Sequence, residues 1–253
     1  MSLFASDALA GKRALVTGAS AGLGRHFALV LAAHGAEVVV GARRTAALEE
    51  VVATISADGG RARAIALDVR NTASVDAAFA GDVPIDVVVN NAGITLTRPA
   101  LDIDDVAWND VVDTNLNGAF RVARAAARAM DASGRGGVIV NIASILAFRV
   151  AKQVAAYGAA KAALVHLTQS LALELAAKRI RVNALAPGYI VTDLNRDFLA
   201  SPAGGAMTRR VPMRRFGEAT DLDGALLLLA SDASRYMTGT TIVVDGGHGT
   251  AWL

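Results

Sequence analysis

Residues 13–24 read RALVTGASAGLG, and this stretch predicts a short β-strand that runs directly into a glycine-rich turn and a helix. Gly18, Gly22 and Gly24 permit a tight turn and a close approach of a ligand to the backbone. The first N–H groups of the following helix carry partial positive charge, which suits a pyrophosphate. The spacing is G-x-x-x-G-x-G rather than G-x-G-x-x-G. Such a turn can need glycines for its geometry alone, but its position after the first strand favours dinucleotide binding.

The rest of the chain alternates short β-branched runs with longer, alanine-rich helical stretches. Strands are expected at residues 13–17, 37–41, 63–67, 85–89, 138–142, 181–185 and 241–244. Helices are expected near residues 22–34, 45–57, 72–80, 104–130, 154–178 and 219–230. This alternation predicts an α/β fold with a doubly wound, Rossmann-like parallel sheet of seven strands. No linker divides the 253 residues, so residues 1–253 are expected to form a single domain.

The composition excludes several classes of protein and site. Hydrophobic residues make up 53% of the chain and charged residues 19%, which argues against disorder. Cysteine is absent, which excludes disulfides and thiolate metal sites and permits a cytoplasmic location. The histidines show no metal-ligand spacing and are interpreted as helical or surface residues: His26, His34, His166 and His248. No metal is therefore expected.

The charge and hydropathy patterns also limit the partners. The formal net charge is +2, and the basic pairs lie far apart without interleaved aromatic residues, so nucleic acid is not expected as a partner. No stretch approaches the ~18 uninterrupted apolar residues of a membrane span. A soluble protein without a membrane partner is expected.

Tyr157 and Lys161 stand four residues apart in a predicted helix, so they share one helix face. An ammonium group on that face can stabilise a phenolate and lower the pKa of the tyrosine from ~10 toward neutrality. Such a tyrosine can act as a general acid and base. Ser144, at the end of the fifth predicted strand, can donate a hydrogen bond to a carbonyl oxygen if the fold brings it beside Tyr157. Taken alone, the pair is more typical of the surface of an amphipathic helix.

Small and polar residues end two further strands. Asn90-Asn91-Ala92-Gly93 ends the fourth predicted strand, where small residues can let a nucleotide lie across the carboxyl edge of the sheet. Asp68 ends the third predicted strand and could contact an adenine. Each feature also has a plain structural interpretation, an ordinary turn for residues 90–93 and a helix N-cap for Asp68.

Taken together and in order, these features resemble the short-chain dehydrogenase/reductase family in its single-domain form, over essentially the whole chain. The resemblance rests on Thr17–Gly24, Asp68, Asn90–Gly93, Asn115, Ser144, Tyr157, Lys161, Pro187-Gly188, Thr192 and Val244–Gly247. It implies that Tyr157 transfers the proton and that Ser144 polarises the substrate oxygen. Lys161 would hold the nicotinamide ribose and lower the pKa of Tyr157. Asn115 would bind a water that links Lys161 to solvent, and it could also mark a helix kink.

The resemblance also implies a nicotinamide dinucleotide cofactor. The residues expected to contact it are Gly18, Ser20, Gly22, Leu23, Gly24, Arg43, Asp68, Val69, Asn91, Ala92, Gly93, Tyr157, Lys161, Pro187, Gly188, Ile190 and Thr192. NADP is expected in preference to NAD, because Ala42 stands where an NAD-selective member usually carries an acidic residue. NAD stays possible. Arg43 offers donors suited to a phosphate. Its alternative roles are to cap the next helix or to face water.

The predicted function is hydride transfer between NADP(H) and a small or medium-sized ketone or secondary alcohol. A 3-oxoacyl carrier-protein reductase is the alternative among enzymes, and a non-catalytic dinucleotide-sensing or scaffold protein is the alternative of another class. The side chains expected to face the substrate are Leu96, Ile145, Leu146, Gln153 and Tyr189. Tyr189 could equally pack under a lid.

Residues 193–216 form the longest irregular stretch and are predicted to be a substrate lid with Gly204-Gly205 as its hinge. The alternative is a pair of short helices that do not move. Arginines at positions 209, 210, 214 and 215 could meet an anionic substrate or an acidic carrier protein, although solvent-facing or salt-bridge roles are commoner. Arg215 matches a frequent structural arginine of the family.

The resemblance implies a homotetramer in which the helices near residues 104–130 and 154–178 pair across one interface. Small residues permit close helix approach: Ala125, Ala126, Ala159, Ala160 and Ala163. Trp252-Leu253 offers an apolar end to bury. The alternative for the small residues is internal packing against the sheet.

Overall fold

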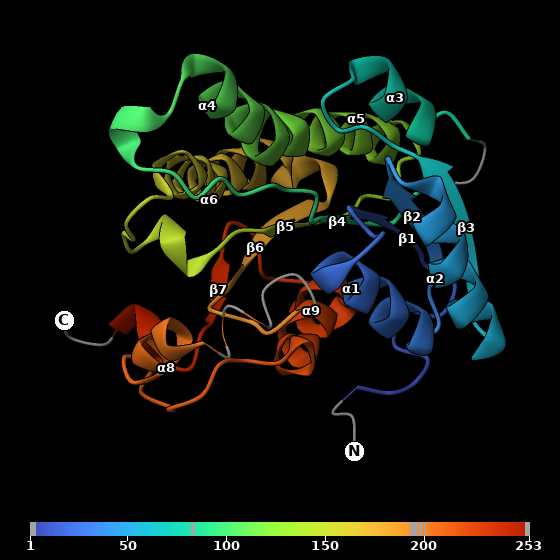
Figure 1. The fold of residues 1–253 in the computed structure, drawn as a ribbon. Coiled ribbons are helices and arrows are strands. Elements are labelled where there is room, and N and C mark those ends of the chain that lie inside the picture. The colour runs from blue at the N-terminus through green and yellow to red at the C-terminus, as the bar shows by residue number, and fades with distance from the viewer. Residues whose placement is uncertain (1–3, 82–83, 193–196, 198, 200, 251–253) are drawn as a thin grey trace.

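The computed structural model describes residues 4–81, 84–192, 197, 199 and 201–250. Seven parallel strands form one sheet in the order β3-β2-β1-β4-β5-β6-β7 (Figure 1). Their bounds are β1 Arg13–Thr17, β2 Glu37–Ala42, β3 Arg61–Ala66, β4 Val87–Asn90, β5 Gly137–Ile142, β6 Ile180–Pro187 and β7 Thr241–Val244. The central strands are buried on both faces, which explains their nearly continuous apolar sequences. The predicted fold class is confirmed, with strand ends that differ from the predicted ones by a few residues at most.

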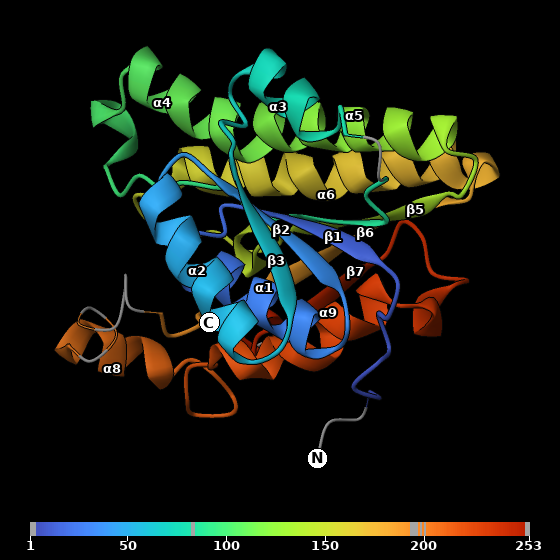
Figure 2. The same cartoon turned by 90° about the vertical axis from the view of Figure 1, so that its right-hand side faces the viewer.

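Helices cover both faces of the sheet (Figures 1 and 2). One layer holds α3 Thr72–Ala78, α4 Asp105–Val112, α5 Gly118–Ala132 and α6 Ala155–Leu175. The other holds α1 Gly22–Ala33, α2 Thr45–Ala57 and α9 Asp223–Ala230. Each layer has its own apolar core, with Phe27 and Leu226 fully buried on one face and Val122 and Ile139 on the other.

The predicted helix at 104–130 is not one regular α-helix, because a π-helical turn, Asp113–Asn117, separates α4 from α5. Asn115 lies in this turn, and its amide donates hydrogen bonds to the carbonyl oxygens of Val111, at 2.9 Å, and of Ile94, at 2.8 Å. A side chain that competes for a helix carbonyl disturbs the regular ladder, and π-turns concentrate at functional sites. The prediction that Asn115 marks an irregularity agrees with the structure.

The segment 193–216 is less irregular than predicted. Helix α8, Pro202–Thr208, begins after Ser201, whose hydroxyl accepts a hydrogen bond from Gly204 N. The proposed hinge, Gly204-Gly205, therefore lies inside a helix, because the Ser201 cap and the proline at the helix start specify a helix despite the glycines. Residues 193–196, 198 and 200 of the predicted lid lie outside the described residues.

The sheet order places the point where the winding reverses between β1 and β4, and ligands of such sheets bind beyond the carboxyl ends of the strands at this point. None of the helices in the described parts of the chain combines the length and the apolar character of a membrane span.

Candidate active site

A cavity of about 1360 Å³ opens beyond the carboxyl ends of the central strands. Ligand pockets commonly measure roughly 300–1,000 Å³, so this cavity has room for more than one ligand. Its walls come from the segments after β1, β2, β4, β5 and β6 and from the start of α6. Four further residues complete them: Asn115, Met207, Arg210 and His248.

The glycine-rich turn after β1 forms one wall of the cavity. Gly18 has a φ of +67°, and a Cβ atom there would lie 2.8 Å from the Cα of Ala92, so the position requires glycine. The amide of Asn91 fixes the turn by donating to the carbonyl oxygens of Thr17, at 3.0 Å, and Gly18, at 3.4 Å. Helix α1 begins without a side-chain cap and without an acidic residue in its first turn. Its first N–H groups are thus suited to an anionic ligand.

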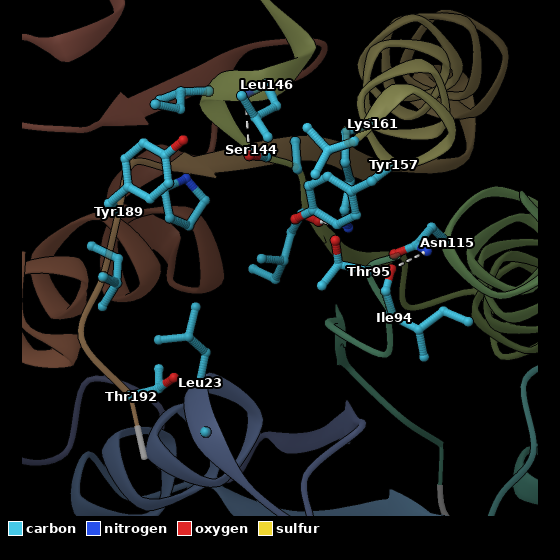
Figure 3. A pocket seen from close by; sticks show the side chains of 18 of the residues that line it. Leu23, Ile94, Thr95, Asn115, Ser144, Leu146, Tyr157, Lys161, Tyr189 and Thr192 are labelled. Carbon is cyan, nitrogen blue, oxygen red and sulfur yellow. Dashed lines mark hydrogen bonds between the residues drawn. The ribbon is translucent and has the colours of Figure 1, made fainter. Parts of the chain in front are cut away.

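Ser144, Tyr157 and Lys161 come together at another wall (Figure 3). Ser144 lies two residues after the end of β5 and is 8% exposed, whereas Tyr157 and Lys161 lie in the first two turns of α6. The ammonium Nζ of Lys161 donates to the carbonyl oxygen of Ile142, at 2.7 Å, and lies 5.6 Å from the centre of the Tyr157 ring. Figure 3 shows Tyr189 facing this group from the opposite side of the cavity.

Burial governs the ionisation of these groups. It raises the pKa of Tyr157; a side-chain hydrogen bond with Ser144 opposes this rise, and Tyr189 adds to it. Burial also lowers the pKa of Lys161 to about 8. The predicted lowering of the Tyr157 pKa by Lys161 is wrong for this geometry, because desolvation of the phenolate is the largest influence.

Asn115 lies behind Tyr157 and Lys161 and is 1% exposed. Its amide nitrogen is fully used, whereas its Oδ1 atom is buried and accepts no hydrogen bond from the described residues. A buried acceptor without a partner is costly unless a water or ligand supplies a donor. Gly93 leaves space beside this oxygen, since a Cβ atom at Gly93 would lie 2.5 Å from it.

A family model described as enoyl-(acyl carrier protein) reductase, adh_short_C2, matches residues 18–249. The chain belongs to the short-chain dehydrogenase/reductase family. The L-rhamnose 1-dehydrogenase (NAD(P)(+)) of Azotobacter vinelandii is 41% identical over 94% of this chain and 97% of its own length. A 3-oxoacyl-[acyl-carrier-protein] reductase of Synechocystis is 40% identical over 95% of this chain and 98% of its own.

A solved structure supports the same assignment. The gluconate 5-dehydrogenase of Burkholderia cenocepacia, in complex with NADP and tartrate, is 36% identical, with a TM-score of 0.92 over 98% of this chain and 99% of that one. This short-chain dehydrogenase/reductase is therefore an oxidoreductase that transfers a hydride between a nicotinamide dinucleotide and an alcohol or ketone.

Most residues expected at the site of this short-chain dehydrogenase/reductase line the cavity. They are Gly18, Ser20, Gly22, Leu23, Arg43, Asn91, Gly93, Asn115, Ser144, Tyr157, Lys161, Pro187, Gly188, Ile190 and Thr192. Gly24, Asp68, Val69 and Ala92 do not line it. Gly24 packs against the carbonyl group of Gly18, and Asp68 accepts a hydrogen bond from Arg70 N at 2.9 Å.

The substrate-facing side chains differ from the expected set at one position. Ile145, Leu146, Gln153 and Tyr189 line the cavity, but Leu96 does not. Its neighbours Thr95 and Thr97 do, because side chains in an extended segment alternate in direction. The prediction for Leu96 was therefore wrong by one residue in register.

Sequence reasoning missed several cations and a histidine at the cavity. Arg44 donates to Ser20 Oγ at 3.1 Å, and Arg149 donates to the carbonyl oxygen of His248. His248, interpreted from sequence as a helical or surface residue, lines the cavity and lies 5.5 Å from the Tyr189 ring, centre to centre. Arg149 and His248 lie far apart in the chain, so no local pattern could have found their contact, whereas Arg44 directly follows the predicted Arg43 and could have been included with it.

Burial, aided by Arg149 and Arg210, lowers the pKa of His248, and Asp245 partly offsets this.

Two other basic residues pair with neighbouring carboxylates and have structural roles. Arg215 pairs with Asp221 at 2.6 Å, in line with a structural arginine, and His26 pairs with Asp223 at the same distance.

Proposed function

We propose that this enzyme is an NADP(H)-dependent dehydrogenase/reductase for a small or medium-sized ketone or secondary alcohol, with Tyr157 as its general acid and base. One observation carries the proposal: the fold brings Ser144, Tyr157 and Lys161 to one wall of a cavity that also contains the glycine-rich turn. A panel of ketones and alcohols, followed by the absorbance of the reduced nicotinamide, tests it. Turnover of none of them with either cofactor would refute it.

The chain's own residues provide the proton chemistry. Ser144 donates a hydrogen bond to the substrate oxygen, and Tyr157 transfers its hydroxyl proton to that oxygen during reduction. The raised pKa keeps Tyr157 protonated at neutral pH, which suits this direction. Lys161 and the free Oδ1 of Asn115 lie behind Tyr157, where a bound water would carry a replacement proton. When bound, the nicotinamide supplies or accepts the hydride.

The residues present fit a dinucleotide. The uncapped start of α1 and the turn at Gly18 suit the pyrophosphate, and the segment from Pro187 to Thr192 would hold the nicotinamide end. Lys161 would hold the ribose hydroxyls.

NADPH should bind more tightly than NADH. Ala42, at the end of β2, lines the cavity without a carboxylate, whereas Arg43 and Arg44 line it with two guanidinium groups. A charge-assisted bond to phosphate contributes about 1.5–3 kcal/mol, so Arg43→Ala should weaken NADPH binding roughly ten- to hundredfold and leave NADH binding nearly unchanged. Arg44→Ala, which also removes the bond to Ser20, should act in the same direction. Fluorescence titration with both cofactors measures the constants.

Arg25→Ala, on α1 and outside the cavity lining, is the control and should leave both constants unchanged. Tighter binding of NADH by the wild type would contradict the preference. Equal NADPH constants for Arg43→Ala and the wild type would contradict the role of Arg43. Ala21, before the middle glycine of the turn, adds no cation, so the preference is expected to rest on Arg43 and Arg44.

A homotetramer is part of the proposal, but the side chains proposed for its interface differ from the alanines expected from the sequence. Ala125, Ala126 and Ala160 are buried within the monomer, so the alternative of internal packing holds for them. Exposed apolar side chains on the same helices remain for a partner: Val106, Trp108, Phe120 and Leu173. Trp252-Leu253 lies outside the described residues.

Light scattering should give a tetramer for the wild type and a smaller species for a Phe120→Glu, Leu173→Glu double variant. A buried carboxylate without a partner would oppose association. Ala53→Glu, on the exposed side of α2 in the other layer, should remain tetrameric. A wild-type monomer at micromolar concentration would contradict this proposal.

The part of 193–216 that carries α8 would close over the substrate, since Met207 and Arg210 line the cavity. A cytoplasmic location is consistent with a chain without cysteine.

A 3-oxoacyl carrier-protein reductase stays the alternative, because relatives with that name are as similar to this chain as the L-rhamnose dehydrogenase is. A comparison of activity on carrier-linked and free ketones separates the two functions. A non-catalytic sensor would have no chemical need for Ser144, Tyr157 and Lys161.

A further inference from the structure

The charges around the cavity are all of one sign. Among the described residues that line it, none is Asp or Glu, whereas the arginines and lysines are Arg43, Arg44, Arg149, Lys152, Lys161 and Arg210. A concave site lined by one sign of charge concentrates ligands of the opposite sign. A dinucleotide phosphate accounts for Arg43 and Arg44 after β2, and Lys161 belongs to the catalytic wall. Arg149 and Lys152, which follow β5, and Arg210, which follows α8, belong to neither group.

Arg149 and Arg210 lie near His248, whose ring contacts Tyr189, across the cavity from Tyr157. Tyr189 acts electrostatically on Tyr157 and contacts the His248 ring, while Arg149 and Arg210 both act on the His248 imidazole. Four side chains from separate parts of the chain, Tyr189, His248, Arg149 and Arg210, therefore lie together in the wall opposite Tyr157. A ligand that is held at Tyr157 and is long enough to cross the cavity would reach the two guanidinium groups.

No carboxylate of the described residues neutralises either guanidinium group. Arg149 donates to the His248 carbonyl oxygen, and neither Arg149 nor Arg210 forms an ion pair with any residue that the structure describes. Asp245, the nearby acid, is committed to its own turn, where it accepts hydrogen bonds from the N–H groups of Gly247, at 2.9 Å, and of Gly249. Cations in a cavity without counter-charges are suited to a charged ligand.

A second observation at the same place points to a ligand. His248 Nδ1 is buried and makes no hydrogen bond with the described residues. A buried polar nitrogen without a partner is destabilising, and it is satisfied when a ligand or a water occupies the space beside it.

We propose that Arg149, Arg210 and His248 form an anion subsite that binds a carboxylate or phosphate group of the substrate. The substrate is then a hydroxy or oxo acid, or a phosphate ester, whose reacting carbon lies at Ser144 and Tyr157. Only the position of the reacting carbon rests on the proposed function. The binding of the anionic group can be measured separately, without turnover.

Calorimetry on the full-length Tyr157→Phe chain saturated with NADP⁺, in which the probes can bind with little or no oxidation, tests the subsite with two matched pairs of probes. D-gluconate is compared with D-glucitol for a carboxylate, and glycerol 3-phosphate with glycerol for a phosphate. In at least one pair, the acid should bind roughly ten- to hundredfold more tightly than its neutral partner, the factor of a charge-assisted hydrogen bond. The pair that shows the larger factor identifies the anionic group.

Arg210→Gln should remove most of this factor. Arg209→Gln is a matched control, because Arg209 is its exposed neighbour and does not line the cavity. His248→Phe keeps the ring contact with Tyr189 but loses both nitrogens, and it should also weaken binding of the acid. Arg149 is less suitable for a test, since its bond to the His248 carbonyl supports the local fold.

The subsite is refuted if neither acid binds more tightly than its neutral partner, or if Arg210→Gln and Arg209→Gln behave alike. Failure of the proposed function has a different signature. In that case no ketone or alcohol is converted, while the preference for the acid and its loss in Arg210→Gln persist. A neutral ketone that is reduced while no acid is preferred would leave the proposed function intact and eliminate the subsite.

Discussion

Replacing Tyr157 by phenylalanine should reduce turnover by roughly 10²–10⁴-fold, the usual contribution of general acid–base catalysis, and leave cofactor affinity unchanged. The ring is kept, so the contact with the Lys161 ammonium at 5.6 Å can persist, and only the ionisable hydroxyl is lost. Steady-state rates and a cofactor titration on the purified variant measure the two effects separately. A variant with wild-type rates would eliminate Tyr157 as the proton donor.

Tyr189→Phe is the matched control, because Tyr189 faces the same cavity from the opposite wall. It should retain most of the activity. The pH dependence adds a second test, since burial raises the pKa of Tyr157 and the neutral phenol therefore prevails at neutral pH. The rate of alcohol oxidation, which needs the phenolate, should rise with pH through the neutral and alkaline range, whereas the rate of ketone reduction should fall only at alkaline pH.

Replacing Lys161 by methionine should abolish most activity and yet stabilise the protein. Lys161 is 4% exposed and forms no ion pair with the described residues. Burial lowers its pKa from 10.5 to about 8. That difference corresponds to about 3 kcal/mol at neutral pH, and loss of the charge-assisted bond to the Ile142 carbonyl oxygen offsets about 1.5–3 kcal/mol of it, so a net gain of at most about 2 kcal/mol is expected.

The sign of the pH dependence follows from linkage. Between pH 8 and 10.5 the unfolded wild type binds more protons at Lys161 than the folded one, so the wild type gains stability as the pH rises through this range. The advantage of Lys161→Met should therefore be complete below pH 8 and disappear toward pH 10.5. Urea denaturation at several pH values measures it, with the exposed Lys12→Met as a control expected within about 0.5 kcal/mol of wild type. A destabilised Lys161→Met protein at pH 7 would contradict the argument.

The sequence alone determined the features that depend on near neighbours in the chain. Three features are local, so they could be interpreted without the fold: the turn from strand to helix at Gly18, the regular βαβ alternation, and the four-residue spacing of Tyr157 and Lys161. These features predicted the sheet, its winding and the family. Even the irregular helix at Asn115 was foreseen as a kink, although not as a π-turn.

Only the tertiary structure decided how distant segments meet. Ser144 reaches Tyr157 because β5 ends beside the start of α6, and His248 reaches Arg149 although 99 residues separate them. The direction of side chains in an extended segment, Thr95 instead of Leu96, also depends on how that segment packs. The tertiary structure also decided the ionisation of Tyr157 and Lys161. The sequence shows that the two residues share a helix face, but desolvation is the largest influence on both pKa values, and it depends on every atom packed around the two side chains.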